Sequence, residues 1–167
     1  CLHRMLRGER PTLADFIDLY RRADCLFTLI AERHSQRTDG NSERHGVAMV
    51  GRNVLVPAVR ELEEGKPLQL SAHSAGSGEK RYFKNAMGGL GQYYAGMLAE
   101  LKIIKFRPNR WPTYTESRGA AIAQRLDHQV PADRFWQTCV DGQVTPGILD
   151  ALAPFCPVLP PRVFAHH

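Results

Sequence analysis

Positively charged side chains are concentrated between residues 80 and 125, and their chemistry is the most distinctive in the chain. This stretch carries nine Lys and Arg residues against two carboxylates, a net charge of +7, whereas the whole chain has 22 Lys and Arg against 17 Asp and Glu, or +5. Ammonium and guanidinium groups bind phosphate oxygens, so this asymmetry indicates a polyanionic partner such as a nucleic-acid backbone. We expect the nine side chains to form one contiguous surface. They are Lys80, Arg81, Lys84, Lys102, Lys105, Arg107, Arg110, Arg118 and Arg125.

Side chains that could support catalysis or hold a metal lack the spacing that such sites need. The four cysteines form no C-x-x-C pair and are best explained as buried free thiols, and the histidines show no helical metal-binding spacing. Residues 74–78 lack the Gly-Lys-Ser/Thr ending of a phosphate loop. Glu64-Gly65-Lys66 is similar to the acidic-x-Lys core of restriction-type nucleases, but that core lies on a strand and these residues end a predicted helix. Cys1 could be an N-terminal nucleophile, but enzymes of that kind are sheet-rich and this pattern is helical. We therefore predict no catalytic residue, metal or cofactor.

Length and composition indicate a folded protein. The chain has 167 residues, of which 43% are hydrophobic and 23% charged, as in one ordinary domain or two small modules. No apolar run approaches the roughly 18–20 residues of a membrane span, and no signal peptide is visible. We expect a cytoplasmic location with no membrane partner. Because the chain starts at Cys1, we also expect it to belong to a larger bacterial protein.

Two helices are predicted in the first 65 residues. Apolar residues at three- and four-residue steps predict a helix from Thr12 to about His34, with Thr12 as N-cap and Asp15 in a capping box. A second helix is predicted over Asn53–Glu64, with Pro57 near its first turn, where a missing N–H costs least. The glutamates at the C-terminal end of that helix oppose its dipole, so this end should be frayed or paired with basic groups.

The Gly- and Ser-containing segment 66–79 predicts a flexible loop or linker. It separates a helical domain, residues 1–65, from a basic module, residues 80–130, which C-terminal helices and a Pro-rich tail follow over residues 131–167. In this last part, Pro131–Val140 is predicted as a helix anchored by Phe135 and Trp136. Thr145-Pro146 then starts another helix that runs to Phe155.

The basic module predicts the order helix, strand, turn, strand, helix. The first helix covers Tyr82–Leu101 with a break at Gly88-Gly89, the strands cover Ile103–Phe106 and Thr113–Thr115, and Thr115 caps the last helix. This order resembles the winged-helix domain of bacterial repressors over roughly residues 80–128. The resemblance is carried by Leu98-Ala99-Glu100-Leu101, Ile103-Ile104, the wing candidate Arg107–Trp111, Tyr114-Thr115 and Gly119–Ala123. Two departures are Lys102, where that family usually has Gly, and a Thr115-to-Gly119 spacing longer by one residue.

The resemblance implies roles for individual residues. Gln92 and Tyr93, with Tyr94, would face bases, while Lys84, Lys102 and Lys105 would flank the DNA backbone. The remaining predicted contacts are Arg107 and Arg110 at the wing tip, and Lys80, Arg81 and Arg118.

The predicted fold is therefore mainly α with a small β-hairpin, in which a helical N-terminal half packs on a winged-helix-like C-terminal half. Its predicted function is double-stranded DNA binding, in a regulatory role or as part of a larger bacterial protein. The alternative is a winged-helix scaffold that binds protein subunits or forms a homodimer, for example in a phage-defence complex. Four glycines in the predicted reading helix and the 14-residue segment before Lys80 favour this alternative, because a helix-turn-helix motif has a turn of about 3–4 residues.

Overall fold

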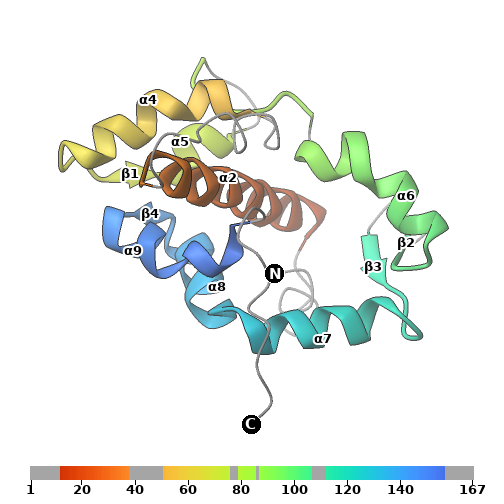
Figure 1. The fold of residues 1–167 in the computed structure, drawn as a ribbon. Coiled ribbons are helices and arrows are strands. Elements are labelled where there is room, and N and C mark those ends of the chain that lie inside the picture. The colour runs from red at the N-terminus through yellow and green to blue at the C-terminus, as the bar shows by residue number, and fades with distance from the viewer. Residues whose placement is uncertain (1–11, 38–50, 76–78, 86, 107–111, 157–167) are drawn as a thin grey trace, which may run out of the picture.

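The computed structural model describes residues 12–37, 51–75, 79–85, 87–106 and 112–156 (Figure 1). These residues form a mostly helical structure with two small antiparallel sheets, which confirms the mainly α prediction with a small hairpin. In chain order the elements are α2 (Leu13–Arg37), α4 (Arg52–Glu63), β1 (Leu68–Gln69), α5 (Leu70–Ser74), the π-helix η1 (Leu90–Tyr94), α6 (Ala95–Glu100), β2 (Ile104–Phe106), β3 (Pro112–Tyr114), α7 (Gly119–Gln129), α8 (Ala132–Asp141), β4 (Gln143–Val144), α9 (Pro146–Ala151) and the 3-10 helix η2 (Ala153–Phe155).

Helix α2 is the central element, and α4, α5, α8 and α9 pack around it (Figure 1). The predicted capping box is confirmed: the Asp15 N–H donates to Thr12 Oγ1 at 3.2 Å, and the Thr12 N–H donates to the Asp15 carboxylate at 3.0 Å. The core lies between α2 and its neighbours, where the side chains of Leu26, Leu29 and Leu55 are fully buried. This burial explains why α2 extends for 25 residues, to Arg37.

Helix α4 agrees with the prediction in position but not in the placement of its proline. Pro57 is the sixth residue of α4, beyond the first turn, so it removes an internal N–H that the Asn53 carbonyl would otherwise accept. At the C-terminal end, Glu63 forms an ion pair with Arg33, and Glu64 pairs with Lys66 at 3.0 Å. The expectation of basic partners at this end is thus confirmed.

The prediction of a flexible segment over 66–79 is wrong for residues 68–74, which form β1 and α5. Strand β1 pairs antiparallel with β4, with Leu68 opposite Val144, and both side chains are buried. Leu70 is also buried, so the two leucines anchor this segment in the core before the Gly- and Ser-rich part begins. Residues 76–78 lie outside the described residues.

A buried guanidinium group holds the chain on both sides of residues 76–78. Arg21 of α2 is 3% exposed, and its Nε donates to the Ser74 carbonyl. Nη1 donates to the Asn85 carbonyl at 2.6 Å, and Nη2 donates to the carbonyls of Ala75 and Phe83 at 3.0 and 2.8 Å. The predicted helix over the first part of Tyr82–Leu101 is wrong, because the described residues 80–85 are irregular and two of their carbonyls bind Arg21 instead.

One turn further along α2, Asp24 holds the start of the next helical segment. Its Oδ2 accepts hydrogen bonds from the Tyr82 hydroxyl and, at 3.1 Å, from the Gly89 N–H. Gly88 has φ +55°, and a Cβ at this position would lie 2.2 Å from Asp24 Oδ2. The close approach therefore requires glycine, and the predicted break at Gly88-Gly89 coincides with this anchor point.

The C-terminal helices follow the prediction closely. Phe135 of α8 is buried, and its ring packs in tilted geometry against those of Phe27 and Phe155, with centroid distances of 4.8 and 4.5 Å. Thr145 Oγ1 accepts from the Ile148 N–H at 3.3 Å as the cap of α9, which ends at Ala151, short of the predicted Phe155. The cysteines at 25, 139 and 156 are buried free thiols, as predicted, and Cys1 lies outside the described residues.

Within the described ranges, no helix has the length and apolar character of a membrane span.

Replacing Arg21 with methionine keeps the apolar stem but leaves four carbonyls without their donor. We expect the free energy of unfolding to fall by about 3–5 kcal/mol in urea denaturation. Arg21→Lys retains the charge without the planar fork and should recover less than half of the loss. Arg134→Met, on the exposed side of α8, is the matched control and should change stability by less than about 0.5 kcal/mol. Wild-type stability of Arg21→Met would contradict the role of this group.

The buried His73 ring should make stability depend on pH. Its Nδ1–H donates to the Lys80 carbonyl at 3.0 Å, and burial lowers the pKa of His73 below its ordinary 6.5. As pH falls through 6.5, His73 is protonated in the unfolded chain before it is protonated in the folded chain. The free energy of unfolding is therefore highest above pH 6.5 and decreases as pH falls below it. Unfolding midpoints measured from pH 7.5 to 5.5 should decline less in His73→Gln than in the wild type. The exposed His128→Gln variant should follow the wild type.

Candidate nucleic-acid interface

The turn that ends α6 positions the first candidate side chain, Lys102. Its backbone has φ +55°, the left-handed conformation that usually requires glycine. The Ile103 N–H donates to the Leu98 carbonyl and the Lys102 N–H to the Ala99 carbonyl, both at 2.9 Å. These two bonds are the Schellman motif, whose left-handed residue is most often glycine. The position where the sequence resemblance expects glycine therefore has the conformation that favours glycine.

An antiparallel hairpin follows this turn, as predicted to within one residue at each strand. Strands β2 and β3 pair Ile104 with Tyr114 and Lys105 with Thr113. Ile104 and Thr113 are buried, whereas Lys105 points to solvent. The predicted wing tip, with Arg107 and Arg110, lies outside the described residues.

The start of α7 is fastened to the end of α6 across the hairpin. Thr115 Oγ1 donates to the Lys102 carbonyl and accepts from the Gly119 N–H at 3.1 Å. Helix α7 nevertheless begins later than predicted, with Arg118 rather than Thr115 at its N-cap position. The Thr115 N–H donates to the Ile103 carbonyl at 3.1 Å, and Arg118 Nη1 donates to the Leu101 carbonyl at 2.9 Å. Three successive carbonyls after α6 thus accept from the segment that leads into α7.

Gly119 allows this close approach. A Cβ at Gly119 would lie 1.9 Å from the carbonyl oxygen of Ile103, far inside van der Waals contact. This contact explains why the sequence has glycine at position 119.

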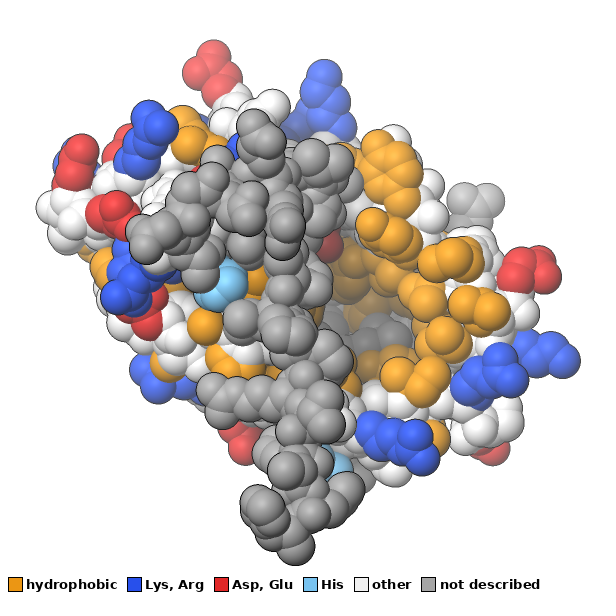
Figure 2. Space-filling model, viewed as in Figure 1, with side chains coloured by type: hydrophobic (Ala, Val, Ile, Leu, Met, Phe, Trp, Pro, Cys, Tyr) orange, Lys and Arg blue, Asp and Glu red, His pale blue; other side chains and the backbone are white. Residues whose placement is uncertain are grey.

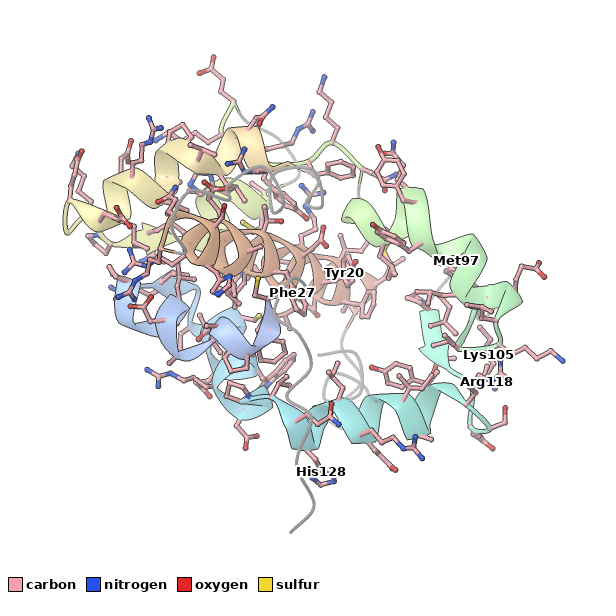
Figure 3. All side chains as sticks on the ribbon, viewed as in Figure 1. Tyr20, Phe27, Met97, Lys105, Arg118 and His128 are labelled. Atoms are coloured by element: carbon pink, nitrogen blue, oxygen red, sulfur yellow. The ribbon has the colours of Figure 1, made fainter. Side chains whose placement is uncertain are left out.

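One group of predicted DNA contacts gathers at this end of the module. Lys102, Lys105 and Arg118 are all exposed, and Figure 3 shows Lys105 and Arg118 near each other beside the hairpin. Within the described ranges, neither lysine forms an ion pair with a carboxylate. Their charges are therefore available to a ligand.

A second group lies at the start of η1. Arg81, Lys84 and Gln92 line a surface groove of about 510 Å³ together with Val54, Glu79, Tyr82 and Phe83. Lys80, which precedes Arg81 in the chain, is exposed, and its carbonyl accepts a hydrogen bond from the His73 ring. Tyr93 is 55% exposed, and its hydroxyl accepts from Gln92 Nε2 at 3.0 Å.

The expectation of one contiguous cationic surface is therefore wrong for the described residues, because η1 and α6 separate the two groups. These helices together cover residues 90–100, which lie between Lys84 and Lys102 in the chain. Figure 2 shows hydrophobic side chains between the Lys and Arg side chains on this face.

Two features that position the site were not predicted. Arg21 and Asp24 fix the segment before η1, and nothing in their local sequence distinguishes them from surface residues of a helix. The second feature is the exposure of apolar side chains: Tyr93, Tyr94, Met97 and Leu101 are 46–55% exposed. Among the described residues, no three His, Cys, Asp or Glu side chains are arranged to hold a metal ion.

Comparison of the chain with protein-family models, with curated proteins and with solved structures finds no significant match.

Gly119→Ala should lower the free energy of unfolding by about 1–3 kcal/mol, because the new Cβ forces the hairpin away from α7. The matched control is Gly96→Ala at the second position of α6, which continues η1, because a Cβ there would meet no atom within 4 Å. That change should instead stabilise the protein by about 0.5–1 kcal/mol through helix propensity. Chemical denaturation of both variants measures these opposite changes in the free energy of unfolding. An unchanged free energy of unfolding in Gly119→Ala would contradict the close approach of α7 to Ile103.

Proposed function

We propose that the chain binds double-stranded DNA through the winged-helix-like module of η1, α6, β2, β3 and α7. The observation that carries this proposal is the left-handed Lys102 at the turn between α6 and the hairpin. A lysine at that position costs stability that a glycine would not. Lys102 occupies this position although its left-handed backbone costs stability. Together with the exposed Lys105 and Arg118, its charge supports a role in binding an anion.

The placement of the two cationic groups on either side of a helix supports a duplex as that anion. The helical residues 90–100 of η1 and α6 lie between Lys84 and Lys102 in the chain. The major groove is about 12 Å wide and admits one helix, with phosphates on both sides. Cations at both ends of η1–α6 would then contact the two backbones, while Gln92 and Tyr93 at the start of the helix face base edges.

A second function, protein binding, is favoured by a different observation. Phosphate contacts do not account for the exposed side chains of Tyr94 at the end of η1, Met97 of α6 and Leu101 just after α6, because a DNA surface is polar and anionic. These side chains support the scaffold interpretation, and the two functions use different residues of the same module.

The DNA proposal is tested with a variant that removes two charges without weakening the fold. Lys102→Gly combined with Lys105→Ala should lose about two phosphate contacts, so the slope of log K against log salt should become shallower by about 1.8 for a random duplex. Replacing the exposed Arg60 and Arg134 with Ala is the charge-matched control and should leave the slope unchanged.

The single change Lys102→Gly adds an independent readout. It should raise the free energy of unfolding by about 1 kcal/mol while weakening DNA binding, since it relieves the left-handed lysine and removes its charge. Equal salt slopes for the double variant and the wild type, or no duplex binding at 50 mM salt, would overturn the proposal.

A further inference from the structure

Exposed hydrophobic side chains are concentrated on the same module. Seven of the ten large hydrophobic residues that are exposed among the described residues fall between positions 93 and 126. Four are on or next to η1 and α6: Tyr93, Tyr94, Met97 and Leu101. The other three are Phe106 of β2 and Ile122 and Leu126 of α7. We call these seven residues the apolar face.

The elements that carry the apolar face bury almost nothing within the described chain. Neither η1 nor α6 has a buried residue, and in α7 only Gly119 is buried. Figure 2 shows hydrophobic side chains over α6 and the hairpin, continuing towards α7 beside a hollow, with Lys and Arg side chains at the outer edge. Helices normally gain stability by burying such a stripe, and the described residues provide no partner for this face.

The area of the face corresponds to one half of a stable dimer interface. Large side chains of this kind cover roughly 150–250 Å² each, so seven that are about half exposed present on the order of 700 Å². A standard interface buries about 800 Å² per partner. The largest apolar patch of an ordinary monomer is about 300–600 Å².

We infer that the apolar face binds the same face of a second copy of this chain in a two-fold symmetric dimer. Helix α7 is suited to this arrangement because Ile122 and Leu126 lie one turn apart on one side of the helix. With two α7 helices antiparallel across a two-fold axis between these residues, Ile122 of each copy contacts Leu126 of the other.

Charge sets how this dimer responds to salt. The chain carries a formal net charge of +5, so two copies repel each other when they associate. Salt screens that repulsion and leaves the apolar contact unaffected. Self-association should therefore hold or strengthen between 50 and 500 mM salt, whereas DNA binding weakens steeply over the same range. The inference stands independently of the DNA proposal.

The experiment is sedimentation equilibrium of the full chain from 1 to 100 μM at 50 and 500 mM salt. The wild type should form dimers and no larger species, and Met97→Glu and Leu126→Glu should each weaken the dimer at least tenfold. Val140→Glu is the matched control, because Val140 is 45% exposed on α8, outside the apolar face. It should dimerise like the wild type, and circular dichroism should show that all variants fold.

Three results would overturn the inference. If the wild type is monomeric at 100 μM, the apolar face does not bind a second copy, and a different protein becomes the candidate partner. Unchanged dimerisation in both glutamate variants places the dimer interface elsewhere. A dimer that dissociates at 500 mM salt means that ion pairs, rather than apolar contacts, hold it together.

Discussion

The buried guanidinium of Arg21 is the interaction on which the placement of the basic module depends. Its four carbonyl partners lie 53–64 residues away in the sequence and belong to the segment that leads to η1. Desolvating a charge is costly, and hydrogen bonds to a charged donor, each about 1.5–3 kcal/mol, must offset that cost. Asp24, one turn along the same face of α2, then binds the Gly89 N–H. Helix α2 thus supplies one guanidinium group and one carboxylate group that fix where η1 starts.

Beyond this anchor, the module is held by backbone hydrogen bonds more than by apolar burial. The Schellman turn at Lys102, the Thr115 hydroxyl and the Gly119 contact tie α6, the hairpin and α7 into one unit. Such bonds fix geometry well, but each contributes only about 1 kcal/mol net. A unit of this construction keeps its shape while its apolar side chains remain available for contact. The same construction explains how a lysine can occupy a left-handed position, because the surrounding bonds determine the turn.

Local signals predicted much of this fold, and distant contacts account for most of what was wrong or missed. The Thr12 and Thr145 caps, the hairpin and the Phe135 helix were predicted because caps and periodicity act over a few residues. The segment at 66–79 was misjudged because Leu68 gains its order from Val144, 76 residues away. The role of Arg21 could not be predicted for the same reason, since its partners are backbone carbonyls, which carry no sequence signature. The candidate cations were chosen by composition, which identifies a charged stretch but not its division into two groups.

The exposure of α6 changes how its sequence pattern should be interpreted. Leu90, Tyr94, Met97 and Leu101 follow helical spacing, which predicts a core-facing stripe. Helical periodicity indicates that one face of a helix is buried, but it does not indicate whether the residues that cover this face belong to the same chain or to another molecule. Here the described chain leaves that stripe exposed, and the cations stand at its ends and outer edge. A partner that covers the stripe would order η1, α6 and α7 without covering the lysines at the hairpin. Tyr93 lies in the apolar face and cannot face bases while a partner covers it. Phosphate binding by the hairpin lysines is still compatible with apolar association, because the association would rigidify the frame that presents these charges.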